Sequence, residues 1–486
     1  MAQSGQPTGV SKTATGMTAA AKGTPVESPP SARVTEVVFR SSMPASAEEV
    51  FAWHERPGAL ERLIPAWMPV EVVSSQGHIR DGARVTLKVP VGPLDVRWEI
   101  EHVGYRAGRE FRDVQRSGPF AQWEHAHRME PAGPGTSMLE DRISYRLPLP
   151  PFGPALGGAF ARARIERLLR WRHAITRADL ERHAAFAARG PHRIAVTGAS
   201  GFVGHALVPF LRGGGHDVRT VGRGPSSDIR WDPERLAIDE ESLEGVDAVI
   251  HLAGAPIATR WTSESKRAIL ESRVKGTRLI AEVCAAMDPR PDVLVCASAV
   301  GYYGDRGDEL LDERSAPGDD FLADVVRAWE EAAAPARDAG IRVVHLRFGV
   351  VLNPGGGALG KMIKPFLAGF GGRLGSGRQW MSWISREDLI GAIHFALQSP
   401  QVHGALNATA PEPVTNATFA STLGRILHRP AIAPVPAFVL RAVYPEMAEA
   451  TILAGQRVRQ GALADAGFPF LHPTLASALR LELGLL

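Results

Sequence analysis

Three glycines between two apolar stretches constrain the second half of this chain more than any other feature. The run Ile194–Val196 predicts a buried strand, and Phe202–Leu211 predicts a helix that opens behind the glycines. Gly198 allows a sharp turn, Gly201 lets backbone approach a pyrophosphate, and Gly204 lets helix and strand pack closely. The N-terminus of such a helix favours anions. A glycine-rich turn without a ligand is the alternative, but the strand-turn-helix context favours a nucleotide site.

Length, charge and cysteine content limit the class of protein. A chain of 486 residues predicts two or three domains, and 44% hydrophobic with 22% charged residues is typical of globular proteins. The 55 Lys and Arg against 52 Asp and Glu argue against a nucleic-acid-binding surface. Cys284 and Cys296 lie in apolar segments, which favours buried free thiols in a reducing compartment. We find neither a membrane-spanning apolar run nor a secretory signal, so we expect a cytoplasmic protein without integral membrane association.

Composition and pattern divide the chain into five parts. The first part is Ser, Thr, Ala, Gly and Pro with few large apolar residues, so we expect a disordered tail; a transit peptide is disfavoured because the segment lacks arginine. Alternating strands, a linker, the glycine motif and a mostly helical end follow. The expected parts are a tail (1–32), a ligand-binding domain (33–186), a linker (187–192), a nucleotide-binding domain (193–430) and a C-terminal extension (431–486).

The first domain shows the pattern of an antiparallel sheet closed by one long helix. Ser46 with Glu49 predicts a capping box for a short helix, and a long helix is expected from Leu156 to His183. Strands are expected at 34–39, 85–89, 94–100, 110–116, 120–129 and 137–147. This order of elements resembles the START-like, polyketide-cyclase-like helix-grip fold. The resemblance implies an apolar pocket between sheet and helix, and therefore a hydrophobic small ligand.

Two groups of charged or titratable residues in this domain have alternative readings. His125 and His127 lie two apart on an expected strand, with His102 on a possible neighbour. A metal site is conceivable, but neither a cysteine nor a carboxylate completes a ligand set at convincing spacing, so we favour a polar outer face and predict no metal. A row of arginines on the long helix is expected to be a solvated face rather than a contact with anionic lipid or acid. These arginines are Arg162, Arg164, Arg167, Arg170 and Arg172.

The end of the second nucleotide-domain strand indicates which dinucleotide is bound. The strand is expected over His216–Val221 and ends at Gly222 and Arg223. A site for NAD favours a carboxylate here, which bonds the ribose 2′-hydroxyl, whereas a 2′-phosphate favours arginine. Because Arg223 has no acid beside it, we predict NADP(H). An ordinary exposed arginine is the alternative.

Several longer stretches resemble the extended short-chain dehydrogenase/reductase superfamily and, more narrowly, its atypical epimerase-like, NADP-binding family. Some members of that family carry a START-like domain in front. The resemblance covers Arg193–Leu486 and implies an α/β, Rossmann-like doubly wound parallel sheet with a small C-terminal extension, preceded by the α+β helix-grip domain. The stretches are Thr197–Gly204, Arg223, His251–Gly254, Ser298–Gly304, Asn353–Gly357, Gly375–Ile384 and Gln456–Val458.

The resemblance also implies which residues contact the cofactor. The phosphate turn is followed by a corner for the 2′-phosphate, by a strand end under the adenosine, and by a helical arginine that adds a second positive charge. These residues are, in that order, Gly198, Ser200, Gly201, Phe202, Val203 and Gly204; Gly222 and Arg223; Leu252 and Ala253; and Arg273.

The catalytic residues depart from the superfamily pattern. Ser298 ends an expected strand where, within one residue, the superfamily has a Ser that polarises substrate, but Phe321 and Val325 occupy the places of its Tyr and Lys. Either Tyr302 or Tyr303 supplies the proton, or the domain binds nucleotide without turnover; a packing role for Tyr303 fits as well. We therefore expect an NADP(H)-dependent oxidoreductase or epimerase-like enzyme on a small organic substrate. The alternatives are a non-catalytic NADP(H)-binding sensor and a lipid or ligand carrier.

Three further stretches carry weaker expectations. Gly355–Lys361 has phosphate-loop spacing, but Met362 replaces the required Ser or Thr, so a lid over the substrate is expected instead. Gly371–Trp383 is expected to line the same cavity, with core packing of its aromatic residues as the alternative. The acidic segment Asp305–Glu313 is expected to be a solvated loop, and Asp388 to cap or open a helix.

Overall fold

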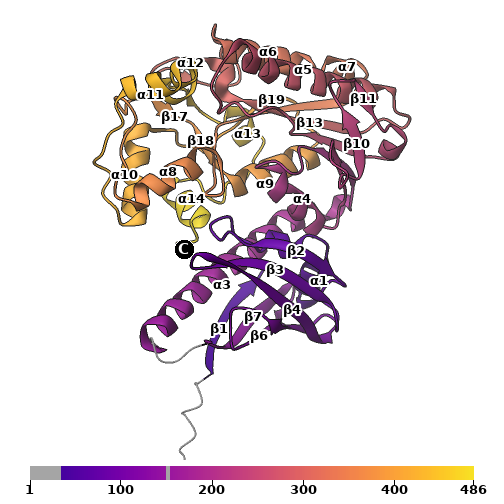
Figure 1. Ribbon diagram of the computed structural model, residues 1–486. Helices are drawn as coiled ribbons and strands as arrows, with labels where there is room; N and C mark the ends of the chain where they lie inside the picture. The colour runs from indigo at the N-terminus through magenta and orange to yellow at the C-terminus, as the bar shows by residue number, and fades with distance from the viewer. Residues whose placement is uncertain (1–33, 149–153) are drawn as a thin grey trace, which may run out of the picture.

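The computed structural model describes residues 34–148 and 154–486, so the expectation for residues 1–32 lies outside the described residues. The chain forms an antiparallel sheet with one long helix, followed by a doubly wound parallel sheet (Figure 1). None of the described helices has the length and apolar character needed to cross a bilayer. The predicted fold class is therefore confirmed in both halves.

The N-terminal sheet has seven strands in the order β1-β7-β6-β5-β4-β3-β2, and all neighbours are antiparallel. Sequence alternation predicted six of them, but β2 was missed because it lies at the sheet edge and five of its six residues are exposed. The strands are β1 (Thr35–Met43), β2 (Glu71–Gln76), β3 (Arg84–Val91), β4 (Leu94–Arg106), β5 (Glu110–Ser117), β6 (Gln122–Gly133) and β7 (Thr136–Arg146).

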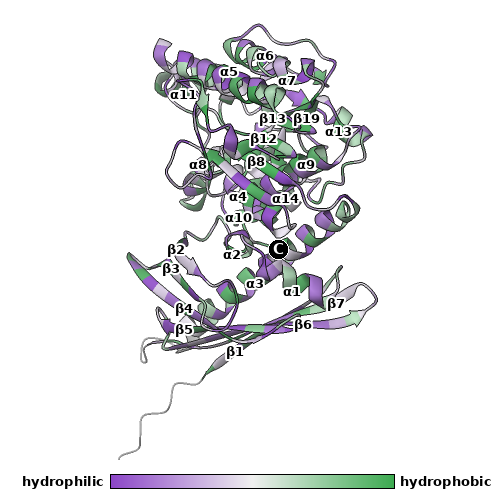
Figure 2. Ribbon diagram, turned by 90° about the vertical axis from the view of Figure 1, so that its right-hand side faces the viewer, coloured by the Kyte–Doolittle hydropathy of each residue, from purple (hydrophilic) through white to green (hydrophobic). Residues whose placement is uncertain are grey.

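Helices α1 (Ala47–Glu55), α2 (Ala59–Arg62) and α3 (Pro154–Ala184) belong to the same domain. The Ser46 hydroxyl accepts a hydrogen bond from the Glu49 backbone N–H and so caps α1 as expected. Figure 2 shows α3 and α1 on the concave side of the sheet. The predicted long helix is confirmed, and its apolar residues Ile165, Leu169 and Ile175 are buried.

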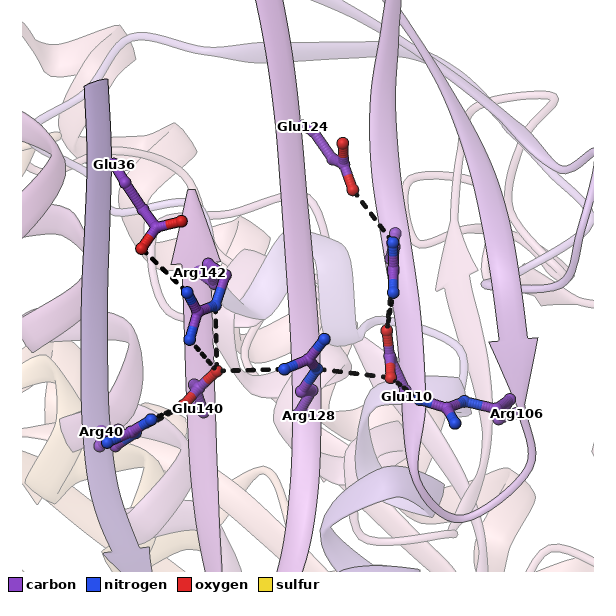
Figure 3. Close-up of polar contacts among 9 residues, drawn as sticks. Glu36, Arg40, Arg106, Glu110, Glu124, Arg128, Glu140 and Arg142 are labelled. Carbon is purple, nitrogen blue, oxygen red and sulfur yellow. Dashed lines mark hydrogen bonds and ion pairs between the residues drawn. The ribbon is translucent and has the colours of Figure 1, made fainter. Parts of the chain in front are cut away.

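Charged residues cover the outer face of this sheet, while its inner face carries apolar side chains, histidines and the carboxylates of Asp113 and Asp141. Figure 3 shows Glu110 and Glu140 each held among arginines of their own and neighbouring strands. Along β6, Glu124 and Arg128 join this outer network (Figure 3). Side chains alternate along a strand, so His125 and His127 point inward and are buried. The prediction that these two histidines lie on a polar outer face is therefore wrong.

The second sheet has eight strands in the order β11-β10-β9-β8-β12-β13-β15-β19. All but β11 run parallel, and the order reverses at β8, where β9 and β12 lie on opposite sides. Ligands bind outside the carboxyl ends of strands at such a point. The strands are β8 (Arg193–Thr197), β9 (Asp217–Gly222), β10 (Ile229–Asp232), β11 (Ala237–Ile238), β12 (Ala248–His251), β13 (Val293–Ala299), β15 (Arg342–Phe348) and β19 (Gly404–Ala408).

Helices cover both faces of the parallel sheet. One core joins α4 (Gly204–Gly213) and α9 (Arg386–Gln398) to the strands. The other joins α5 (Ser263–Ala286) and α7 (Ala334–Asp338), and α6 (Phe321–Glu331) packs on α5. Figure 2 shows the hydrophobic strands β8, β12 and β13 enclosed between these layers. Strands buried on both faces read as continuous apolar runs, as the sequence indicated for β8 and β12.

The remaining elements form a smaller unit beside the sheet. They are β14 (Leu310–Leu311), β16 (Val350–Leu352), α8 (Gly357–Leu367), β17 (Trp380–Met381), β18 (Trp383–Ser385), β20 (Val414–Thr415), α10 (Asn416–Leu427), α11 (Ala437–Val443), α12 (Pro445–Met447), the π-helical turn Ala448–Leu453, β21 (Arg457–Val458), α13 (Gly461–Asp465) and α14 (Leu475–Glu482). The acidic segment before α6 holds this unit, because Glu313 accepts hydrogen bonds from the backbone of Asn407 and Ala462, and Asp312 pairs with Arg459. It is therefore more than the solvated loop we expected.

A buried ion network joins the two halves. Arg62 lies between Asp179 of α3 and Glu387 of α9, and all three side chains are almost inaccessible. Arg182 of α3 pairs with Asp388 at the start of α9, where Ser385 is the N-cap. Buried ion pairs thus connect the two halves.

The arginine row of α3 is only partly a solvated face. Arg167 and Arg170 donate to carbonyls of residues 483, 484 and 486, and Arg172 donates to the Leu63 carbonyl. Arg162 and Arg164 remain exposed. The expectation was therefore wrong for Arg167 and Arg172, whereas Arg170 stays exposed while it binds the Leu486 carbonyl.

Candidate active site

The glycine motif forms a cradle between the ends of β8 and β12. Gly198 has a φ of +67°, and a Cβ there would lie 2.8 Å from the Leu252 carbonyl carbon. A Cβ on Gly204 would lie 2.2 Å from the Gly198 carbonyl oxygen. Glycine is therefore required at both positions by shape alone. Ser200, Gly201, Phe202 and Val203 complete the turn that leads into α4.

Helix α4 begins with backbone donors available to a ligand. Its N-cap is Val203, and within the described residues no side chain caps this end. Unpaired N–H groups at a helix N-terminus, together with the positive end of the helix dipole, form an anion site. The residues of the predicted phosphate turn are thus brought together in a geometry that suits a pyrophosphate.

Thr197 and His251 fix the floor of the cradle. The Thr197 hydroxyl accepts hydrogen bonds from the backbone N–H of Leu252 and of Ala253, and lies 2.8 Å from His251 Nδ1. Burial lowers the pKa of His251 to about 4, so the ring is neutral at neutral pH. These contacts hold Leu252 and Ala253 against Gly198, where adenosine was predicted to lie.

Arg223 lies at the mouth of a corner made by Gly222 and the serines of the following loop. It is exposed, and Ser226 and Ser227 line the same hollow. The nearby carboxylate of Asp228 accepts hydrogen bonds from the backbone and hydroxyl of Thr220. That acid is therefore engaged in its own loop, while on another side Arg223 borders a smaller hollow with Asp232 and Asp239.

Arg273 lies under the loop that follows β12, and its contact with the cofactor stays a prediction. Its guanidinium is buried, donates to the carbonyls of Ala255 and Ile269, and lies over the ring of Trp329. Burial lowers the pKa of Arg273 to about 10. Its observed contacts hold the loop after β12.

Ser298 belongs to a buried polar network at the end of β13. Its hydroxyl donates to Glu330 Oε1 at 2.6 Å, and Arg347 donates to both oxygens of Glu330. Burial would raise the pKa of Glu330, but the hydrogen bond and charge of Arg347 outweigh it and lower the pKa. Sequence reasoning missed Glu330 and Arg347. An arginine within the apolar strand Arg342–Phe348 was the available signal.

The two candidate tyrosines differ in burial and in hydrogen bonding. Tyr303 is fully buried, donates its hydroxyl hydrogen to Asn407 at 2.8 Å and accepts from Arg347. Burial raises its pKa to about 12, which opposes proton transfer at neutral pH. Tyr302 is half-buried under the Arg347 guanidinium. Phe321 begins α6 and Val325 is buried, so the helix expected to carry the Tyr and Lys is present without them.

One hollow of about 1620 Å³ includes both the apolar pocket predicted for the N-terminal domain and the nucleotide corner. One wall comes from inner residues of the antiparallel sheet and the other from the cradle. The wall residues include Val85, Leu87, Trp98 and Ile100 on one side, and Gly198, Ser200, Gly201, Gly222, Arg223, Leu252 and Ala253 on the other.

Buried histidines and a carboxylate also line this hollow, on strands β4, β5 and β6. Asp113 lies opposite His102 and His125 in the sheet register, and His102 Nδ1 is 2.7 Å from Asp113 Oδ1. Burial would raise the pKa of Asp113, but hydrogen bonds from His102 and His127 lower it well below its usual value. Asp113 is therefore the carboxylate that sequence reasoning did not find; its cross-strand position could not be read without the register.

The expected lid segment lies beside the phosphate turn, whereas the contacts of Gly371–Trp383 are with other elements. The glycines before α8 pack on the Phe202 ring, where a Cβ on Gly356 would lie 2.9 Å from it. Trp383 is fully buried and donates to the Glu412 carbonyl, and Gln379 donates to backbone of Leu374 and Ile452. Trp383 and Gln379 thus have structural contacts in the smaller unit.

Family models match three segments of the chain. Residues 194–408 match the NAD dependent epimerase/dehydratase family, residues 43–172 match polyketide cyclase / dehydrase and lipid transport, and residues 435–481 match a domain of unknown function. These segments agree with the helix-grip, Rossmann-like and C-terminal parts recognised from the sequence.

Relatives of known sequence or structure match either about 60% of this chain or nearly all of it. An epimerase family protein of Mycobacterium bovis is 43% identical over 290 residues, which are 59% of this chain and 96% of the relative. The nucleoside-diphosphate sugar epimerase from Corynebacterium glutamicum is 33% identical with a TM-score of 0.76, over 92% of this chain and 90% of that one. Human epimerase family protein SDR39U1, solved with NADPH, is 37% identical with a TM-score of 0.57, over 60% of this chain and 100% of that one. This chain belongs to the NAD dependent epimerase/dehydratase family, with a polyketide cyclase-like domain in front.

Proposed function

We propose that this protein is an NADP(H)-dependent oxidoreductase or epimerase-like enzyme that acts on a small organic molecule. The observation that carries the proposal is the glycine cradle at the open end of α4 together with the exposed Arg223 at the end of β9, where Asp228 is bonded to Thr220. The human relative solved with NADPH supports the same choice of dinucleotide. When bound, the nicotinamide supplies or accepts hydride.

Each part of the cradle has a distinct task in this proposal. The N–H groups at the start of α4 hold the pyrophosphate, and Leu252 and Ala253 support the adenosine ribose. Arg223 pairs with the 2′-phosphate. Ser298 orients the substrate, and its own hydroxyl is held by Glu330. Tyr302 is the tyrosine at this strand end that is not fully buried.

Replacing Arg223 with alanine tests the choice of dinucleotide. We expect NADPH affinity to fall about 10- to 100-fold, because a charge-assisted hydrogen bond to the 2′-phosphate contributes about 1.5–3 kcal/mol. NADH affinity should stay unchanged, since NADH lacks that phosphate. Titration of nicotinamide fluorescence with both nucleotides measures this. Equal losses for NADPH and NADH, or no loss for either, would contradict the assignment.

We also propose that the N-terminal domain binds a hydrophobic ligand in the hollow. Val85, Leu87 and Ile100 provide apolar wall, and the family model of this segment describes polyketide cyclases and lipid transport. Ile100→Trp should weaken binding of an apolar fluorophore about tenfold by filling the hollow. Val38→Trp, at a 38% exposed position, is the matched control and should bind like wild type. Equal affinity of both variants would count against the pocket.

A second candidate function is a nucleotide-binding protein without turnover. Phe321 and Val325 in place of the proton-transfer pair, and the buried hydroxyl of Tyr303, favour it. A screen of carbonyl compounds for NADPH oxidation separates the two functions. Oxidation that is lost in Ser298→Ala supports the enzyme, whereas NADPH binding without oxidation of any compound supports the second candidate.

A further inference from the structure

Three potential metal ligands converge on the inner face of the N-terminal sheet. Asp113, His125 and His127 each offer one ligand atom, and these atoms all lie within 4.8 Å of one another. Asp113 Oδ2 is 3.4 Å from His127 Nε2 and 3.7 Å from His125 Nδ1. Metal bonds of about 2.1 Å in tetrahedral geometry separate ligand atoms by about 3.4 Å. The spacing therefore suits one ion among the three side chains.

The remaining ring nitrogens of both histidines face a second carboxylate. His127 Nδ1 is 2.7 Å and His125 Nε2 is 3.5 Å from Asp141 Oδ1, while His173 holds the other oxygen of Asp141 at 3.0 Å. Metal-binding histidines almost always direct their second nitrogen to such a partner, which fixes the ring and raises its basicity. Asp141 is thus placed to orient both imidazoles.

The two imidazoles lie close to Asp141 but are not aligned with it for hydrogen bonding. Among the described residues, His125 Nε2, His127 Nδ1 and Asp141 Oδ1 are buried and make no hydrogen bond of good geometry. Buried polar atoms are nearly always paired with protein, water or an ion. The two histidine atoms belong to rings whose other nitrogens face Asp113 at the three-ligand centre, whereas the other oxygen of Asp141 is held by His173. An ion at that centre would fix the ring orientations that the pairs with Asp141 need.

One side of the cluster opens to the apolar hollow. Asp113, His125 and His127 all line it, and the ring of Phe111 stacks on His127 at a centroid distance of 4.2 Å. A site with three protein ligands and an accessible side is the arrangement of a catalytic rather than a structural metal. Two histidines and one carboxylate suit iron(II) or zinc.

We propose that Asp113, His125 and His127 bind one divalent transition-metal ion, with an open coordination position that faces the hollow. A hydrophobic ligand carrying an oxygen or nitrogen donor completes the coordination there. His102, beside Asp113, orients the carboxylate, and Asp141 orients the two imidazoles. The ligand at the open position rests on the proposed hydrophobic ligand, but the metal site shares no residue with the nucleotide cradle, so its failure would leave the proposed NADP(H) binding untouched.

Titration of the metal-stripped, tag-free full chain with cobalt(II) tests the site. We expect one equivalent to produce saturable visible absorption and zinc to displace it. Asp113→Asn and His127→Gln should weaken cobalt binding by more than about 100-fold, whereas Asp141→Asn should weaken it by about 10- to 100-fold, as for other partners of metal ligands. His403→Gln removes an exposed imidazole of the other domain and should bind like wild type.

Two measurements keep the result decisive. Thermal unfolding followed by circular dichroism shows whether each variant is folded, and X-ray absorption of the cobalt protein reports imidazole among its ligands. The proposal is overturned if the wild-type chain takes up no stoichiometric cobalt. It is also overturned if folded Asp113→Asn and His127→Gln bind cobalt as tightly as His403→Gln.

Discussion

Replacing Arg62 with methionine is expected to lower the free energy of unfolding by about 3–5 kcal/mol, the usual cost of removing one partner from a buried ion pair. Arg62 is 2% exposed and donates to both oxygens of Asp179 at 2.8 Å and to Glu387. Methionine fills similar space but leaves buried Asp179 without its cation and leaves Glu387 with Arg386 alone. Urea unfolding at neutral pH measures the loss.

Two further variants separate lost charge pairing from lost packing. Among the described residues Asp179 has an ion pair with Arg62 alone, so Arg62→Met with Asp179→Asn removes the unpaired carboxylate and should be less destabilised than Arg62→Met alone. Arg84→Met breaks an exposed pair with Glu101 and should unfold like wild type. A loss of similar size for Arg62→Met and Arg84→Met would show that the buried network does not fasten the domains.

The second large effect is expected at Gly204. A Cβ there meets the Gly198 carbonyl oxygen at 2.2 Å and the Ala199 Cα at 2.7 Å, and both are backbone atoms that cannot turn aside. Gly204→Ala must therefore displace the phosphate turn. We expect NADPH affinity to fall about 100-fold, as overpacking by up to about 3 kcal/mol implies.

Gly158→Ala is the matched control, because nothing lies within 4 Å of a Cβ added there on α3. It should bind NADPH like wild type. Circular dichroism must show that Gly204→Ala is folded before its affinity is compared. Wild-type NADPH affinity in folded Gly204→Ala would contradict the placement of the pyrophosphate at this turn.

The sequence predicted the fold well wherever local pattern decides the structure. Alternation gave six strands of the first sheet, and the glycines marked the turn between β8 and α4. Edge strand β2 lacked alternation, and β15 and β19 carried no motif that drew attention to them. Phe321 and Val325, which occupy the places of the superfamily's Tyr and Lys, lie in the first turns of α6.

The site was predicted less well where it depends on distant contacts. Which face of β6 points inward is decided by its partners, so His125 and His127 were assigned to the wrong side. Asp113 meets them only through strand register, and Glu330 meets Ser298 only after α6 packs on β13. Likewise, the carbonyls that bind Arg167 come from the far end of the chain. Sequence spacing carries no information on such pairs.

Because the sheet interior and the dinucleotide corner border one continuous space, occupants of the two sides are neighbours. A molecule long enough to extend from Ile100 towards Arg223 would touch the adenosine end of the nucleotide rather than its reactive ring. Contact between the two bound molecules would contribute a coupling free energy, which changes the affinity for each of them equally. Bound nucleotide would then change the affinity of the N-terminal domain for its ligand, and that ligand would change the affinity for the nucleotide by the same factor.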